Sequence, residues 1–338
     1  MSEPLVTRVL NGFHDPLVAP NAWNALLTTG DSDVLFLTWQ WQEAWWRSFG
    51  RGRLLLVAVE KRGRPIAIAP LFADSGMVFF VGSGGSDYLD FVGDVSDPNV
   101  LESLLSVAIG SVAPFLGFRL YHVPGDSRTG ARLRAAGERL GLQWYDEGGS
   151  AAPRLSLSDP QQARAATQKE SLRRHEAFFQ RGGRLEVSTV TKAAAILPQL
   201  PEFFAQHIAR WSATPHPSLF LDPLRRDFYA RVTQSLDPTG WLRFTRVDWE
   251  DRTIAFHFGF CYRGSYLWYK PSFAIDLARH SPGEVLLRRL LLAAIAEGAD
   301  TFDFGLGDET FKRRFATHIP VVSTWGLYPP KQTEPLPR

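Results

Sequence analysis

The side chains best suited to catalysis lie in two strand-like segments of the C-terminal half. In residues 254–262 side chains alternate between faces, so His257 lies on the same face as Gly259, which leaves space beside the imidazole. In residues 301–305 Asp303 faces away from its phenylalanine neighbours, and a carboxylate in a buried strand needs a partner. His257 and Asp303 are therefore candidate general bases. For both, the alternative is a hydrogen-bonded structural side chain.

The segment 265–273 adds two polar candidates on opposite faces. Tyr269 is a candidate acid for a leaving group. Lys270 ends an aromatic strand, which is unusual enough to suggest contact with an acceptor substrate. Snorkelling of the lysine to solvent is the alternative interpretation.

A helix is expected to begin after the loop 274–281, with Ser281 as its N-cap and Pro282 in the first turn. Free backbone N–H groups at such a helix start favour an anion, usually phosphate. The predicted donor-binding residues are Arg279, Ser281, Gly283, Glu284 and Val285.

The first half contains a glycine-rich loop, GSGGSDYLDF, directly after a predicted strand. Two aspartates and a tyrosine there suit recognition of an amine, so Asp87, Tyr88 and Asp90 are candidate acceptor contacts. A plain connecting loop is about as good an interpretation. Trp39, at the start of a tryptophan-rich helix, is a candidate wall of a cleft.

Composition and missing motifs exclude several classes of protein. The 338 residues include one cysteine, Cys261, which excludes an internal disulfide framework and a cysteine-based zinc site. There is no H-E-x-x-H, phosphate-binding P-loop, G-x-S-x-G or dinucleotide-binding glycine motif, so we expect no metal and no nucleotide redox cofactor. Without a signal peptide pattern or an uninterrupted apolar run of ~18 residues, a cytoplasmic protein with no transmembrane segment is expected.

A basic segment separates the two halves. Asp159 and Pro160 predict the start of a helix over 160–181, and two glycines end it. By general experience its arginines form a solvated face. An anion-binding role for Lys169, Arg173 and Arg174 is the alternative, although the whole chain is nearly balanced, with 37 basic and 35 acidic residues.

The elements that must position these residues repeat once along the sequence. Arg64-x-Ile66-Ala67 recurs as Arg252-x-Ile254-Ala255, at an offset of 188 residues, within paired hairpin patterns. We expect a mixed α/β (α+β) fold with two tandem domains, 1–155 and 156–338, each a mixed, largely antiparallel twisted sheet flanked by helices. The expected strands are 54–60, 66–72, 77–82 and 118–123, then 241–248, 254–262, 265–273 and 301–305, and the last strand, 321–328, is expected to close the second half.

Several of these segments resemble the CelD-like family of the GNAT acyltransferases, which is related to the FemAB-type aminoacyltransferases. The resemblance rests on LTWQWQEAWWRSFG, GSDYLDF, KESLRRHEAFFQRGG and, most specifically, HSPGEVLLRRLLLAAIAEGADTFDFGLGDETFKRRF. It implies two tandem GNAT-like domains and transfer of an acyl group, from acyl-CoA or acetyl-CoA, to an amine. The acceptor would be a small molecule or a precursor of the cell envelope or of a polysaccharide.

One departure from that family bears on the donor. Pro282 removes an N–H donor and Glu284 adds a negative charge where enzymes that use acyl-CoA often carry small residues. An acyl carrier protein or an aminoacyl-tRNA is therefore an alternative donor. A binding protein that keeps the fold without catalysis is a further alternative.

Overall fold

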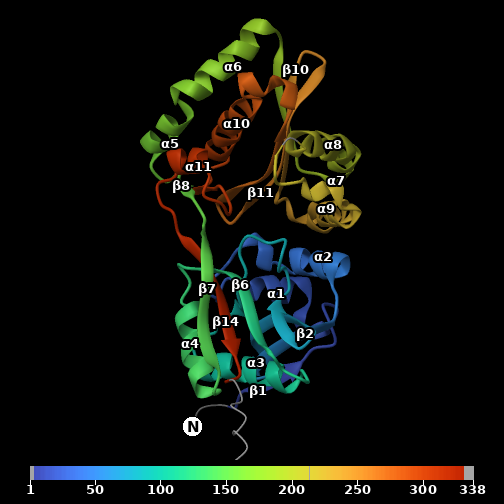
Figure 1. Ribbon diagram of the computed structural model, residues 1–338, viewed down its shortest axis with the longest axis vertical. Coiled ribbons are helices and arrows are strands. Elements are labelled where there is room, and N and C mark those ends of the chain that lie inside the picture. The colour runs from blue at the N-terminus through green and yellow to red at the C-terminus, as the bar shows by residue number, and fades with distance from the viewer. Residues whose placement is uncertain (1–3, 213, 331–338) are drawn as a thin grey trace, which may run out of the picture. The chain divides into compact units, whose positions relative to one another are not determined.

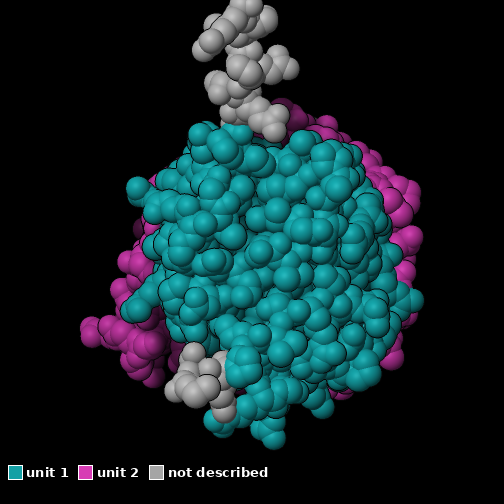
Figure 2. All heavy atoms as spheres, turned by 90° about the horizontal axis from the view of Figure 1, so that it is seen from below, with its two compact units in different colours: residues 1–150, 320–338 teal, residues 151–319 magenta. Residues whose placement is uncertain are grey.

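The computed structural model describes residues 4–212 and 214–330, and the chain divides into two compact units. Unit 1 comprises residues 1–150 and 320–338, and unit 2 comprises residues 151–319 (Figure 2). In sequence, unit 2 is thus inserted before the last strand of unit 1. Each unit has its own sheet.

Unit 1 is a mixed sheet in the order β1-β2-β3-β4-β6-β14-β7, with β5 paired to β3. β1 to β4 pair antiparallel, whereas β4 and β6 run parallel because a crossover containing helix α3 connects them (Figure 1). The strands are β1 (Val6–Val9), β2 (Arg53–Lys61), β3 (Arg64–Asp74), β4 (Met77–Phe80), β5 (Val92–Gly93), β6 (Gly117–Pro124), β7 (Gln143–Ala151) and β14 (Val321–Tyr328). The helices are α1 (Pro20–Leu27), α2 (Trp39–Phe49), α3 (Pro98–Gly110) and α4 (Thr129–Arg139).

Unit 2 repeats this arrangement in the order β9-β10-β11-β12-β13-β8. β9 to β12 pair antiparallel, and helix α10 then crosses over so that β13 runs parallel to β12. The strands are β8 (Arg154–Ser156), β9 (Leu185–Val190), β10 (Leu242–Trp249), β11 (Arg252–Tyr262), β12 (Ser265–Phe273) and β13 (Thr301–Asp303). The helices are α5 (Pro160–Thr167), α6 (Glu170–Gly182), α7 (Ala193–Ile196), α8 (Leu200–Trp211), α9 (Pro223–Leu236), α10 (Pro282–Ala296) and α11 (Thr310–Phe315).

The two sheets share one order of connections: an antiparallel run, a helical crossover and a parallel strand. The predicted mixed α/β fold with two related halves is therefore confirmed. The last strand departs from the expectation. β14 pairs antiparallel with β6, beside β7 in the sheet of unit 1 (Figure 1), and in unit 2 β8 takes the equivalent place beside β13. The prediction that residues 321–328 close the second half is therefore wrong, because local pattern does not show which sheet a strand joins.

The basic segment also differs from its prediction. Asp159 caps a helix as expected, since its Oδ1 accepts hydrogen bonds from the backbone N–H groups of Gln161 and Gln162 at 2.9 and 3.4 Å. The helix ends at Thr167, however, and Lys169 is in an extended conformation before α6 begins. The predicted single helix is thus two helices, and the break allows both α5 and α6 to pack on α10 (Figure 1).

Both faces of the unit 2 sheet are covered. On one face, α10 packs against β11 and β12 and buries Leu286 and Leu290. On the other, Phe203 of α8 meets the rings of Phe244 and Phe256 at centroid distances of 5.8 and 6.1 Å. The middle of β11 is consequently buried on both faces, so the open space expected beside His257 is filled.

Candidate active site

A cavity of about 190 Å³ lies in unit 2 where α10 begins. Its walls come from the second half of β12, the first turns of α10, the short helix α11 and one arginine of α8. Most of the lining is apolar or aromatic. The lining residues are Arg210, Trp268, Pro271, Phe273, Ala278, Ser281, Gly283, Glu284, Leu287, Phe311, Arg314 and Phe315.

The cavity forms because β12 continues beyond the end of its parallel partner, β13. The pairing with β13 ends at Leu267 and Asp303, whereas β12 continues to Phe273. Two residues of this stretch offer no backbone N–H to a ligand. Pro271 has no N–H, and the N–H of Tyr269 already donates to His257 Nε2 at 3.2 Å. The strand edge therefore offers fewer oxyanion donors than an ordinary strand would.

A polar cluster borders the cavity at the first turn of α10. Glu284 accepts hydrogen bonds from Arg314 and from His175 Nδ1, each at 2.8 Å, and Ser171 Oγ contacts the same arginine at 3.2 Å. Burial pushes the pKa of Glu284 upward, but the hydrogen bonds from Arg314, His175 and Ser171 outweigh it, so this pKa lies below its usual value. Glu284 is thus an ionised carboxylate held between two basic side chains.

Arg210 faces the cavity from α8. Its guanidinium donates to the Pro271 carbonyl at 2.8 Å and lies over the Phe273 ring, 4.4 Å from the centroid. Burial lowers the pKa of Arg210 to about 10, with Glu309 acting in the opposite direction, so the group is still charged at neutral pH. Within residues 4–212 and 214–330 no carboxylate forms an ion pair with it. Arg210 therefore presents an incompletely neutralised positive charge to an aromatic cavity.

His257 occupies a different environment from the one expected. Its ring is fully buried, stacks on Trp268 at 5.5 Å and accepts the Tyr269 N–H described above. Burial lowers its pKa to about 3. The imidazole is absent from the cavity lining, and its contacts are those of a structural residue that fills the sheet at Gly259.

Asp303 is also held by its own unit. Its Oδ1 accepts the Gly305 N–H at 2.8 Å, and its Oδ2 lies 3.4 Å from Arg154 Nε, on the neighbouring strand β8. Only 3% of the residue is exposed, and it does not line the cavity. Its role as a general base stays a prediction, and the contacts favour a structural role.

Tyr269 and Lys270 lie away from the cavity. The Tyr269 ring stacks on Tyr229 of α9 at 6.2 Å, on the face of the sheet that α8 and α9 cover. Lys270 Nζ lies 3.8 Å from the centroid of the Tyr269 ring. The structure brings these two side chains together but not to the cavity wall.

The loop that precedes α10 follows the prediction in part. Ser281 occupies the N-cap position and lines the cavity, but its backbone is left-handed (φ 53°) and its hydroxyl makes no capping bond. The N–H groups of Glu284 and Val285 both donate to the Ser281 carbonyl, at 3.0 and 3.4 Å. Val285 is fully buried, and the exposed Arg279 donates to His280. Few donors are thus left here for a phosphate.

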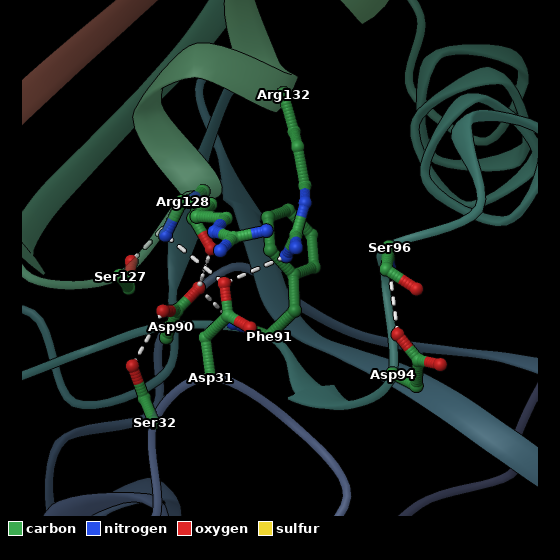
Figure 3. A network of polar contacts seen from close by, with 10 residues as sticks. Asp31, Ser32, Asp90, Phe91, Asp94, Ser96, Ser127, Arg128 and Arg132 are labelled. Atoms are coloured by element: carbon green, nitrogen blue, oxygen red, sulfur yellow. Dashed lines mark hydrogen bonds and ion pairs between the residues drawn. The ribbon is translucent and has the colours of Figure 1, made fainter.

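The acceptor candidates of unit 1 belong to a folded loop. Asp90 is 2% exposed and accepts hydrogen bonds from Ser32 and Thr129 at 2.6 and 2.8 Å (Figure 3). Burial raises the pKa of Asp90, against the effect of these bonds. Tyr88 is equally buried, against Phe36, and Asp87 is half-buried.

That loop also closes the place in unit 1 that corresponds to the cavity. β4 and β6 separate after Val78 and Phe118, as β12 and β13 do in unit 2. Here the Leu89 N–H donates to the His122 carbonyl at 2.9 Å, and His122 Nδ1 donates to the Ser86 carbonyl at 2.7 Å. The loop therefore pairs with β6 beyond the point of separation. Trp39 lies elsewhere in unit 1, where its Nε1 donates to the Phe13 carbonyl at 2.9 Å.

Sequence reasoning missed Arg210, His175, Arg314 and the aromatic walls of the cavity. Two of these had a signal, because His175 and Arg314 lie within the segments that carry the family resemblance. Arg210 had none, since an arginine near the end of an amphipathic helix is ordinary.

Among residues 4–212 and 214–330, the structure shows no group of three acidic, histidine or cysteine side chains placed to hold a metal ion. In the same residues, no helix is long and apolar enough to cross a membrane.

Buried histidines should make unit 2 sensitive to acid. His207 resembles His257 in that burial lowers its pKa to about 3, helped by the charges of Arg210 and Lys270, and its Nδ1 bonds to Ser218 Oγ at 2.8 Å. Between the unfolded value of about 6.5 and about 3, the unfolded chain binds more protons. The free energy of unfolding should therefore fall as pH drops below 6.5, by about 1.4 kcal/mol per pH unit for each histidine.

Urea unfolding at pH 7.0, 6.0 and 5.0, followed by circular dichroism, measures this slope. His207→Gln should remove roughly half of it, since one of the two groups no longer titrates. A wild-type stability that stays constant over this range would show that the two imidazoles are accessible to protons in the folded state.

Residues 166–313 match the family described as acetyltransferase (GNAT) domain. No curated protein matches the sequence. The fold is similar to that of FemX (TM-score 0.67, 11% identity, covering 92% of this chain and 96% of that one). It is also similar to a conserved protein of unknown function from Bacteroides thetaiotaomicron (0.62, 13%, 96% and 100%). A third structure with this fold is the C-terminal domain of a protein assigned as lysylphosphatidylglycerol synthetase from Agrobacterium fabrum (0.55, 14%, 84% and 86%).

At these identities the solved structures establish the fold alone, and the family match is limited to residues 166–313. The matched range contains Arg210, His175 and Glu284, so most of the cavity lining and most of the polar cluster fall inside it. Residues 166–313 are thus similar to an acetyltransferase (GNAT) domain, and the chain has the fold of FemX.

Proposed function

We propose that this protein is an N-acyltransferase that moves an acyl group from a thioester donor, in the first place an acyl-CoA, to an amine. The acceptor is a small molecule or a precursor of the cell envelope or of a polysaccharide. One observation carries the proposal: within the GNAT domain, an aromatic cavity opens where β12 leaves β13 and α10 begins. We assign transfer to unit 2, residues 151–319, which holds most of the predicted domain 156–338, because the corresponding place in unit 1 is closed by its own loop.

The cavity suits one part of a donor rather than a whole one. Pockets that enclose a complete drug-sized ligand measure ~300–1000 Å³, and this one measures about 190 Å³. Its walls are the rings of Trp268, Phe273 and Phe311, which favour a hydrocarbon or aromatic group. We therefore place the acyl group here, with its carbonyl near the mouth.

The reaction forms a C–N bond and breaks a C–S bond. The amine nitrogen attacks the carbonyl carbon, the amine loses a proton, and sulfur leaves as a thiolate that is protonated from solvent. Among the described residues that line the cavity, Glu284 is the one carboxylate, so it is our proton acceptor, with His175 hydrogen-bonded behind it. It takes the role first predicted for Asp303 and His257, whose contacts are internal to the sheet.

Arg210 is placed to stabilise the negative charge that develops on the carbonyl oxygen or on the departing sulfur. We expect Arg210→Ala to lower kcat/KM by about tenfold, the effect of losing one charge-assisted contact of ~1.4 kcal/mol. Arg210→Lys should recover part of the loss, because it restores the charge without the planar fork. Steady-state kinetics with the melting temperature as a parallel readout would separate this from misfolding. Unchanged kinetics in a folded Arg210→Ala protein would remove Arg210 from the mechanism.

The assay that tests the function uses purified full-length chain. Acetyl-CoA and longer acyl-CoAs are offered with a panel of primary amines, and release of free thiol is followed. Amine-dependent thiol release that Leu287→Trp abolishes, by filling the cavity, would support the proposal. Complete absence of release with every acyl-CoA would exclude coenzyme A thioesters, and absence of any transfer from carrier-protein and tRNA donors as well would leave a binding protein.

A second donor class has a specific observation in its favour. The first turn of α10 carries the ionised Glu284, Pro282 has no N–H, and two further amides are already hydrogen-bonded. A diphosphate would meet a carboxylate at that position. This favours the alternative in which an acyl carrier protein or an aminoacyl-tRNA, as in the FemAB-type enzymes that the sequence resembles, delivers the acyl group.

A further inference from the structure

A second hollow in unit 2, of about 640 Å³, lies between α6 and α10. Charged side chains dominate its lining, with four arginines against two glutamates. The lining residues are Gln168, Glu170, Arg173, Arg174, Glu176, Ala177, Gln180, Arg288 and Arg289. This groove and the aromatic cavity have no lining residue in common, so they are separate sites.

A buried carboxylate organises the floor of the groove. Glu176 has only 3% of its side chain exposed and forms ion pairs with both Arg288 and Arg289. Arg288 also donates its Nε–H to the Thr167 carbonyl at 3.0 Å, so this side chain ties α5, α6 and α10 together. Arg289 keeps about a third of its side chain exposed. The floor is therefore rigid, and its guanidinium groups are fixed before any ligand arrives.

The wall of the groove carries the excess positive charge. Arg173 and Arg174 are exposed side chains of α6. The nearest carboxylate to Arg174 is that of Glu170, at 3.8 Å, with 92% of the glutamate side chain in solvent. Such an exposed pair contributes ~0–1 kcal/mol, so both arginines are available to another anion.

We propose that this groove binds phosphate groups. The planar guanidinium fork matches the geometry of phosphate oxygens, and arginines held in place beforehand lose less conformational freedom on binding. The volume is in the range of sites that take a nucleotide-sized ligand. The inference depends on the groove alone and not on acyl transfer.

The groove begins close to the polar cluster. Arg288 follows Glu284 by four residues on α10, which is about 6 Å along the helix axis. Two ligands share the required chemistry: a small molecule with a diphosphate, and the phosphodiester backbone of an RNA. Either ligand, bound in the groove, would place a phosphate about one helical turn from the cavity. The first turn of α10, at the cavity itself, offers few hydrogen-bond donors.

The test compares two charge-reversed chains with the same net charge. One carries Arg173→Glu and Arg174→Glu, in the groove. The control carries Arg164→Glu and Arg181→Glu, which are exposed on α5 and α6 but lie outside the lining. The probes are inorganic pyrophosphate and coenzyme A, measured by isothermal titration calorimetry, and a labelled single-stranded RNA, measured by fluorescence anisotropy, all at low ionic strength.

We expect the wild type to bind at least one probe, the groove variant to bind it at least about tenfold more weakly, and the control to stay within about twofold. Binding of pyrophosphate and coenzyme A identifies a small-molecule source, and binding of RNA alone identifies a phosphodiester. For RNA, the slope of log affinity against log salt should shrink by about 1.4 when two contacts are lost. No binding of any probe by the wild type, or equal weakening in both variants, would overturn the inference. If the groove variant does not fold, Arg173→Ala with Arg174→Ala replaces it, with Arg164→Ala and Arg181→Ala as the control and the same criterion.

Discussion

Gly259→Ala should strongly destabilise unit 2. A Cβ atom at this position would lie 1.9 Å from His257 Cε1 and 2.7 Å from the Leu267 carbonyl oxygen. Neither neighbour can move easily, because the imidazole is fully buried against Trp268 and Leu267 is part of β12. Overpacking in a closed core costs ~1–3 kcal/mol, and we expect a loss at the top of that range, about 3 kcal/mol of the free energy of unfolding.

Chemical denaturation monitored by circular dichroism measures the effect. Gly110→Ala is the matched control, since a Cβ atom at that position would meet no neighbour within 4 Å, and Gly110 ends helix α3, where alanine is favoured. The double substitution with His257→Ala should cost less than the sum of the single ones by more than ~1 kcal/mol, because removing the ring removes the collision. A Gly259→Ala protein as stable as the wild type would mean that the sheet relaxes at this point.

The alternation of β11 side chains between the two faces of the sheet was correctly predicted. The residues of β12 that lie opposite Gly259 were not. The register of β11 and β12 shifts between Phe258 and Phe260, so that Trp268 and Tyr269 together face one glycine. The His257 ring fills the resulting gap and binds the Tyr269 N–H. A bulge depends on the pairing of two strands, and neither strand alone shows it.

The glycine-rich loop of unit 1 shows the same limit for polar residues. From the sequence, Asp90 suits either contact with a substrate or burial in a hydroxyl network. Its partners Ser32 and Thr129 are 58 and 39 residues away, on other segments (Figure 3). Only the tertiary fold decides which polar groups meet, so a buried and a solvent-facing aspartate look alike before the structure is known.

The segments that carry the resemblance were the better guide to the site. Two of them meet at one point. The first supplies His175 from α6, and the longest supplies both Glu284 at the start of α10 and Arg314 from α11. Residue type alone directed attention to isolated acids and histidines within strands. The cluster was not predicted because its members are separated by 109 and 30 residues and are joined only by packing of the three helices.

Glu284→Gln should lower kcat/KM by at least ~10²-fold, the usual range for loss of a group that accepts a proton in the transition state. The amide cannot accept the proton of the attacking amine, and it leaves Arg314 without a counter-charge. Since hydrogen bonds keep the pKa of Glu284 below its usual value, the wild-type carboxylate is ionised throughout the neutral range. Thiol release or product formation, measured with whichever donor proves active, gives the ratio.

Two companion variants distinguish chemistry from folding. Glu138→Gln makes the same substitution on a side chain of α4 that is 66% exposed and lines neither hollow of unit 2, and should leave kcat/KM within about twofold. His175→Gln keeps Glu284 charged but removes the imidazole that is hydrogen-bonded to it, so it should lower kcat less than Glu284→Gln does. Because Glu284 joins α6, α10 and α11 through hydrogen bonds from His175 and Arg314, some loss of melting temperature is expected in Glu284→Gln and does not by itself count against the mechanism. A folded Glu284→Gln protein with near wild-type kcat/KM would show that the proton goes elsewhere, and Asp303 would then be the next carboxylate to replace.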